Sequence, residues 1–127
     1  MPDRRSDDRV QIGLNCVLYI DQTTEMNAVV KDISEIGVAF EIPFSDVVYE
    51  MMQNKRDITF AFLDDFMFFD ASVSAVCQAK ATIVRITKSE DVILIGCKLN
   101  PSKQIRSYVE KKKVNKFLAE IDAGKGS

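Results

Sequence analysis

Histidine is absent from the sequence, and only three cysteines are present. Histidine is the commonest metal ligand in proteins and the side chain that most often exchanges protons at neutral pH. Cys16, Cys77 and Cys97 stand singly in apolar segments without a CxxC spacing, which predicts reduced core side chains, with a reactive surface thiol as the alternative. We therefore expect no metal and no cofactor.

Long apolar runs are also missing. The segments ITFAFL (58–63) and VILIG (92–96) fall far short of the ~20 residues that a membrane span requires. No apolar stretch follows the charged start MPDRRSDDR, so no secretory signal is indicated. The sequence predicts a cytoplasmic protein without membrane insertion.

The chain has no excess of positive charge. Its formal net charge is -2, whereas a domain that binds nucleic acid is normally basic overall. A barrel that binds single-stranded nucleic acid through a basic arm is therefore a disfavoured hypothesis, and we expect no nucleic-acid partner.

Alternation of apolar and polar residues dominates what is present. With 127 residues the chain suffices for one domain, and residues 10–20 alternate with period two, as a strand does. Further strands are expected at 26–33, 37–42, 57–63, 67–86 and 92–99, with LDDF (63–66) as a turn. About six or seven strands at hairpin spacing are typical of a small antiparallel barrel or sandwich. We favour the barrel because closure removes exposed edges.

Two segments predict helices. Pro43 ends a strand, and Ser45 can cap a short helix in which Val47, Val48 and Met51 recur at helical spacing. Residues 101–123 are rich in helix formers, and the tail 124–127 carries no packing signal.

The C-terminal helix has two apolar faces. Ile105, Tyr108 and Val109 share one face, and the other, roughly opposite, holds Val114, Phe117, Leu118 and Ile121. Either the helix bends near the three lysines at 111–113 or its second half meets a different partner. Those lysines indicate a solvated face, with contact to an anionic surface as the alternative.

Other clusters have ordinary explanations. The paired acids Asp64 and Asp65 lack the histidine or convergent ligands that catalysis would require, so turns and solvated faces explain them, and we find no basis for an enzyme. The apolar run at 66–69 is expected to fill the barrel, with a partner-docking patch as the alternative.

Three arginines, Arg4, Arg5 and Arg9, precede the first strand in polar sequence. They fit a solvated, flexible arm of residues 1–9, but guanidinium groups also bind phosphate bidentately and stack on planar bases. The later segment DISEIG (32–37) fits a hairpin turn in which Gly37 supplies freedom for positive φ. Its carboxylate and hydroxyl can also bond to guanine.

Taken together, Arg5 and Arg9 (RxxxR) followed by DxSxxG at 32–37 resemble the PilZ domain family, receptors for the bacterial second messenger cyclic di-GMP. The hairpin ATIVRI to VILIGCKL resembles the family's late strands, so the resemblance covers residues ~4 to 100. It implies a mainly β fold, a six-stranded antiparallel barrel at 10–100 with a short helix between strands and a C-terminal helix.

The resemblance also implies roles for six residues. Arg5 and Arg9 would engage phosphates and stack on guanine with help from Arg4, Asp32 and Ser34 would contact a guanine edge, and Gly37 would permit the turn. Two departures stand out: Asp7 and Asp8 lie where the family commonly has an aromatic residue and a proline, and Leu99 replaces a phenylalanine. The acids should weaken phosphate binding, and Leu99 should affect packing more than binding.

The leading hypothesis is a cyclic di-GMP receptor that changes its interaction with an effector protein when the arm closes on the nucleotide. The alternative is an adaptor that uses the same fold without nucleotide and docks through residues 66–69 or 114–121. Homodimer formation stays open.

Overall fold

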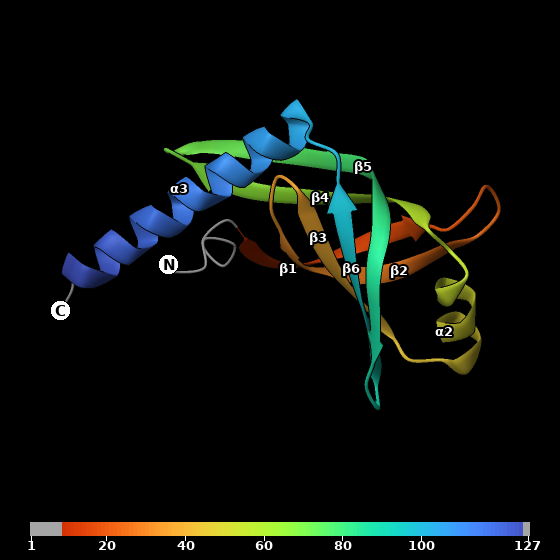
Figure 1. The fold of residues 1–127 in the computed structure, drawn as a ribbon. Helices are drawn as coiled ribbons and strands as arrows, with labels where there is room; N and C mark the ends of the chain where they lie inside the picture. Colours follow the sequence, from red (N-terminus) through yellow and green to blue (C-terminus); the bar gives the residue numbers. More distant parts are fainter. Residues whose placement is uncertain (1–8, 126–127) are drawn as a thin grey trace, which may run out of the picture.

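The computed structural model describes residues 9–125 and contains six strands and two helices (Figure 1). The elements are β1 (Val10–Tyr19), β2 (Glu25–Ile33), β3 (Gly37–Pro43), α2 (Asp46–Gln53), β4 (Asp57–Phe68), β5 (Ala71–Lys88), β6 (Val92–Leu99) and α3 (Lys103–Lys125). Ser45 caps α2 by accepting from the Val48 N–H at 3.4 Å, as predicted. Within this part of the chain, no helix combines the length and apolarity needed to cross a membrane.

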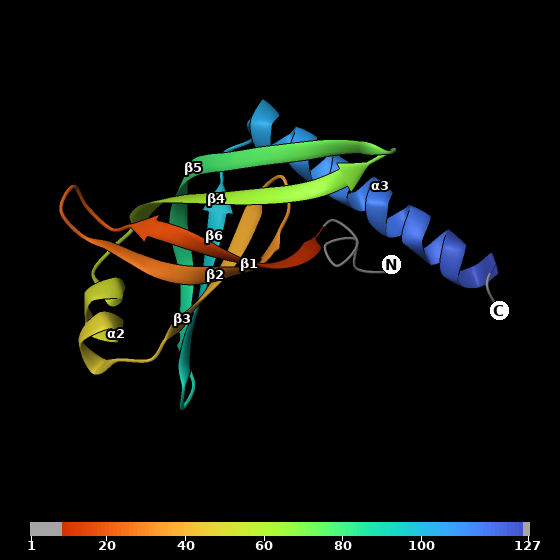
Figure 2. The same ribbon diagram turned by 180° about the vertical axis from the view of Figure 1, so that it is seen from behind.

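The strands pair antiparallel in the order β1-β2-β3-β6-β5-β4, and pairing of β1 with β4 closes the sheet into a ring. The expected mainly β fold of six antiparallel strands with two helices is confirmed. The helices α2 and α3 lie toward opposite ends of the ring (Figures 1 and 2). Each strand has two hydrogen-bonded neighbours, but β1 pairs with β4 only at Thr59–Ala61 and β6 pairs with β5 only from Ala81 onward, so the outer part of the β4–β5 hairpin keeps open edges.

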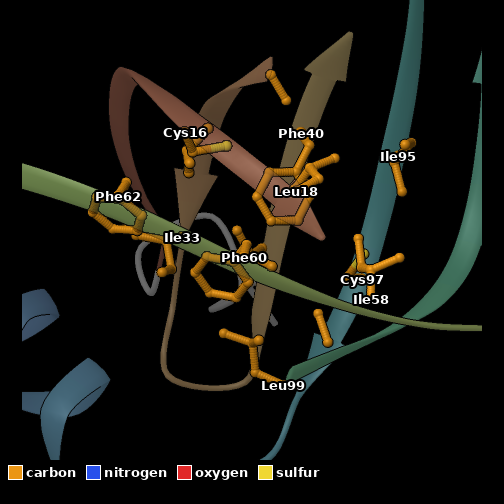
Figure 3. Packing of buried hydrophobic residues seen from close by; sticks show 14 of the residues in the cluster. Cys16, Leu18, Ile33, Phe40, Ile58, Phe60, Phe62, Ile95, Cys97 and Leu99 are labelled. Carbon is orange, nitrogen blue, oxygen red and sulfur yellow. The ribbon is translucent and has the colours of Figure 1, made fainter. Parts of the chain in front are cut away.

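The interior of the ring holds the core (Figure 3). Leu18, Phe40 and Phe60 are fully buried there, and the two phenylalanine rings meet edge to face at 5.2 Å between centroids. The period-two alternation of the strands sends these residues inward and their neighbours outward. All three cysteines are buried and unpaired, which confirms the prediction of reduced core side chains.

The turn expected at LDDF (63–66) is wrong, because β4 continues through it to Phe68. The chain reverses instead at Phe69 and Asp70, which have φ of 47° and 65° and connect the paired residues Phe68 and Ala71. A two-residue hairpin loop of this kind requires positive φ at both central positions, which usually favours glycine or asparagine. The sequence lacks that signal here, so the turn was placed too early.

Asp64 is part of the core rather than of a turn. Its side chain is 8% exposed, and its Oδ2 accepts from the Tyr108 hydroxyl at 2.8 Å and pairs with the Lys112 Nζ at 2.9 Å. Burial and this hydrogen bond raise the pKa of Tyr108 well above its usual value. The three side chains fasten the first half of α3 to β4.

The prediction that residues 66–69 fill the barrel is also wrong for part of the run. Phe66 packs against Tyr108, but Met67 and Phe69 are 56% and 66% exposed. The hairpin of β4 and β5 extends beyond the ring (Figure 1), so side chains near its tip have no interior to enter.

The C-terminal helix is continuous from Lys103 to Lys125, so it begins and ends two residues later than expected and does not break at the three lysines. Its Ile105, Tyr108 and Val109 face is buried, as predicted. Phe117 is 61% exposed, so the second half is not packed against the sheet.

Candidate functional site

Arg9 and Asp32, which are far apart in the sequence, meet at the start of β1. Val10 pairs with Ile33 and Gln11 pairs with Asp32, so the antiparallel register brings the residue before β1 to the end of β2. The Arg9 Nη1 lies 2.6 Å from Asp32 Oδ1, and the two side chains are 44% and 25% exposed. The ion pair is therefore open to a ligand.

Ser34 shapes the turn between β2 and β3. Its Oγ accepts from the backbone N–H groups of Ile36 and Gly37 at 3.3 and 3.1 Å, and the Ser34 N–H donates to the Gly37 carbonyl at 2.8 Å. The Ile36 carbonyl accepts from the N–H of Leu99 at 2.8 Å. Ser34 is 4% exposed, and this network fixes the backbone beside Asp32.

Gly37 is required for a different reason than the sequence indicated. Among the described glycines only Gly13 has positive φ, so the expectation that Gly37 supplies left-handed freedom is wrong. A Cβ at Gly37 would lie 3.3 Å from the Cys97 carbonyl oxygen and 3.6 Å from the Arg9 Nη2. The distance to the β6 carbonyl is tighter than an ordinary contact, so a side chain at this position would push against β6, which favours glycine.

A row of residues crosses the outer face of the sheet beside the ion pair. The register aligns Asp32 with Ala39, Ala39 with Gly96, and Gly96 with Arg85, across β2, β3, β6 and β5. Ala39 has only a methyl group and Gly96 has no side chain, so the surface between Asp32 and Arg85 is low. We call this stretch the low floor. A pocket of about 390 Å³ covers this floor, and Lys31, Thr87, Leu94 and Ile95 complete its lining.

Three register shifts border this row. They lie between Gln11 and Leu14 in β1, between Val30 and Asp32 in β2, and between Ile83 and Arg85 in β5. Bulges bend strands and redirect side chains, and they are common next to functional sites. The first shift contains Gly13 and borders a second hollow of about 480 Å³ that shares Lys31 and Asp32 with the pocket.

Lys31 and Arg85 were not among the predicted site residues. Lys31 lines both hollows and pairs with Glu41 at 3.3 Å between Nζ and Oε2. Arg85 packs over Gly96, where an added Cβ would lie 3.9 Å from three of its atoms. Arg85 belongs to the segment ATIVRI, but only the pairing of β5 with β6 reveals that it shares a row with Asp32.

The structure thus brings together Arg9, Asp32, Ser34 and Gly37 of the predicted site. The predicted residues Arg4 and Arg5 lie outside the described part of the chain, as do Asp7 and Asp8. Between residues 9 and 122, no three aspartate, glutamate or cysteine side chains are grouped to hold a metal ion. With Arg9 beside Asp32, and with Lys31 and Arg85 lining the same pocket as Asp32, the site suits an anionic ligand that also carries hydrogen-bond donors.

The first half of α3 lies against the turn that follows Asp32. The Arg106 Nε is 3.7 Å from Glu35 Oε2, and Lys113 lines a small hollow of about 180 Å³ together with Ser34, Glu35 and Ile36. The turn and α3 are therefore neighbours at the surface.

Comparison with known proteins agrees with the fold. The model of the family described as "PilZ domain" matches residues 3–111. The fold resembles the crystal structure of the Borreliella burgdorferi PlzA protein in complex with c-di-GMP, with a TM-score of 0.56 and 11% sequence identity over 94% of this chain. The chain spans about half of PlzA, 52% of its length, and at this identity the likeness concerns the fold alone. No curated protein matches the sequence. Because the family match covers most of the chain, this protein belongs to the PilZ domain family, a family of receptor domains and not of enzymes, as its sequence predicted.

Proposed function

We propose that the protein is a cytoplasmic receptor for cyclic di-GMP. The nucleotide binds on the outer face of the ring, next to Arg9 and Asp32, and binding changes the interaction of the protein with an effector protein. The observation that supports this best is the Arg9–Asp32 pair, 2.6 Å apart, at the edge of the low floor that leads to Arg85. Cyclic di-GMP is also the ligand named for the PlzA complex.

The chemistry of the site matches the two parts of such a nucleotide. A carboxylate accepts hydrogen bonds from the N1 and N2 donors of guanine, and Asp32 still has its Oδ2 available beside the contact with Arg9. Guanidinium groups bind phosphate bidentately and stack on bases, which suits Arg9 on one side of the floor and Arg85 on the other. Because Arg85 packs over Gly96, the base in this proposal stacks on the Arg85 guanidinium above this glycine. The base contact of Ser34 stays a prediction, and its hydroxyl also holds the turn.

The arm of residues 1–9 closes over the bound nucleotide in this proposal. Arg4 and Arg5 then reach the phosphates, and Arg9 anchors the arm next to Asp32. Fixing the arm costs roughly 1–2 kcal/mol of backbone entropy per residue, so the contacts with the ligand must exceed that sum. A segment that becomes ordered when a ligand binds is a known type of conformational switch. Its signal can reach α3 through the Glu35–Arg106 contact.

Calorimetric titration with cyclic di-GMP tests the assignment. A charge-assisted hydrogen bond contributes about 1.5–3 kcal/mol, so Arg9→Ala and Asp32→Ala should each weaken binding by roughly 10- to 150-fold. Arg85→Ala should weaken it in the same way, whereas Arg56→Ala, an exposed arginine after α2, is the matched control and should bind like the wild type. Absence of heat with the wild-type protein would remove the proposal.

A second candidate, an adaptor that does not need nucleotide, is favoured by exposed apolar side chains on the β4–β5 hairpin. Leu63 and Val76 face each other across the strands and are 54% and 58% exposed, and Phe69 at the tip is 66% exposed. In this case a bound partner would tolerate Asp32→Ala but not Phe69→Ser, with and without nucleotide. A partner that tolerates Phe69→Ser but is lost with Asp32→Ala would contradict the adaptor and leave only the receptor hypothesis.

A further inference from the structure

The second half of α3 carries an apolar face that the sheet does not cover. Phe117 and Ile121 are 61% and 37% exposed, and Val114 and Leu118 are half-buried. Near the middle of α3, Asn115 Nδ2 donates a hydrogen bond to the Met67 carbonyl of β4 at 2.8 Å. Beyond it the helix projects away from the ring, as Figures 1 and 2 both show.

The spacing of these four residues is that of a helix–helix contact. Positions 114, 117, 118 and 121 follow the i, i+3, i+4, i+7 pattern, which places them in one stripe on a straight helix. We call this stripe the α3 seam. It spans about 10 Å at 1.5 Å per residue, or two turns.

Charged residues flank the α3 seam with opposite signs at its two ends. Lys111 precedes the seam and Asp122 follows it. At ~100° per residue their positions differ by only about 20° around the helix, so both lie along the same side of the seam. The Lys111 Nζ donates to Ser107 Oγ of its own helix at 2.9 Å, and Asp122 is exposed.

We propose that the α3 seam binds the same seam of a second copy of this chain, with the two helices antiparallel. In this arrangement Val114 lies near Ile121 of the second copy, and Phe117 near its Leu118. Lys111 then lies near Asp122 of the second copy, and the two-fold symmetry repeats this pair. A parallel pair would instead set this side of one helix against the opposite flank of the other, which carries Lys113 near the level of Lys111 and Glu120 near the level of Asp122. Like charges would then meet, so the charges select the antiparallel arrangement.

The size of the contact predicts a weak dimer. Two helical turns provide less surface than a standard stable interface, so we expect a dissociation constant above about 1 µM. The proposal does not depend on nucleotide binding, because none of the seam residues lines the candidate site.

Sedimentation equilibrium of the full chain without nucleotide, from low to high micromolar concentration, tests the contact. The wild type should shift from monomer to dimer, and Phe117→Glu should raise the dissociation constant by more than about tenfold, because it places two like charges inside the seam. Ala119→Glu adds the same charge on the opposite side of the helix and should behave like the wild type. Circular dichroism establishes that each variant is folded.

A charge exchange tests the direction of the helices. Lys111→Glu and Asp122→Lys should each weaken the dimer, and the double variant should restore it, because the exchanged charges attract again across an antiparallel seam. A wild type that stays monomeric at the highest concentration would overturn the proposal. So would a dimer that tolerates Phe117→Glu, or single variants whose effects simply add in the double variant.

Discussion

The attachment of α3 to the sheet can be tested at one buried oxygen atom. Asp64 Oδ2 accepts from the Tyr108 hydroxyl at 2.8 Å and lies 2.9 Å from the Lys112 Nζ, and the aspartate side chain is only 8% exposed. The substitution Tyr108→Phe removes one partner of this oxygen. The ring contacts of residue 108 with Phe62 and Phe66, at 5.4 and 6.0 Å between centroids, are kept.

The expected loss follows from the charge and burial of the acceptor. A hydrogen bond to a charged group contributes about 1.5–3 kcal/mol, and because Lys112 still pairs with the same oxygen we expect the lower end, about 1.5–2 kcal/mol. For a domain of this size such a loss lowers the melting temperature by about 5–10 °C. No cavity forms, since phenylalanine fills the same space, so the effect measures the hydrogen bond itself.

Urea unfolding is the assay. The midpoint should fall without a change in the slope m, because the same surface is exposed on unfolding. Lys112→Met should destabilise as well, and the double variant should lose about 0.5–3 kcal/mol more than the sum of the two, since it leaves the buried carboxylate without a partner. Tyr19→Phe, at a tyrosine that is 38% exposed, is the matched control and should change the free energy of unfolding by less than about 0.5 kcal/mol. Equal effects of Tyr108→Phe and Tyr19→Phe would refute the reasoning, and so would additive single variants.

Two further predictions concern the backbone, and two concern the thiols. Gly37→Ala should destabilise the fold by about 1–3 kcal/mol in urea, because the new Cβ would lie 3.3 Å from a fixed carbonyl oxygen of β6; an unchanged midpoint would contradict the close approach. Replacing Phe69 and Asp70 with Asn-Gly should stabilise by about 1 kcal/mol or more, since both positions have positive φ; a loss of stability would contradict the assigned turn. Burial raises the pKa of Cys97 from 9.0 to about 12 and that of Cys77 to about 11, so folded protein should react with a thiol reagent at pH 8 far more slowly than unfolded protein. The native state retains these protons while the unfolded state loses them, so the free energy of unfolding should be unaffected by the thiols below pH 9 and fall as the pH rises from 9 through 11.

Local chemistry was sufficient to predict much of the fold. Period-two alternation identified the strands because a strand in a closed sheet must turn alternate side chains inward. The cap at Ser45 was also predictable, because a helix cap depends only on atoms close by in the sequence. The turn after β4 was not, because Phe69 and Asp70 adopt positive φ without the residues that usually signal it. Asp64 and Asp65 resembled a turn, but Tyr108 and Lys112, more than forty positions away, bury one of these acids.

The sequence by itself determined which residue types can meet an anionic nucleotide, because the arginines before β1 and the DISEIG segment carry the required donors and acceptors. Only the tertiary structure decided how they are arranged. Strand register, which depends on packing around the whole ring, places Arg9 beside Asp32 and adds Arg85 through two intervening strands. It also decided why Gly37 is a glycine: the constraint is the distance to another strand and not the φ of the residue itself.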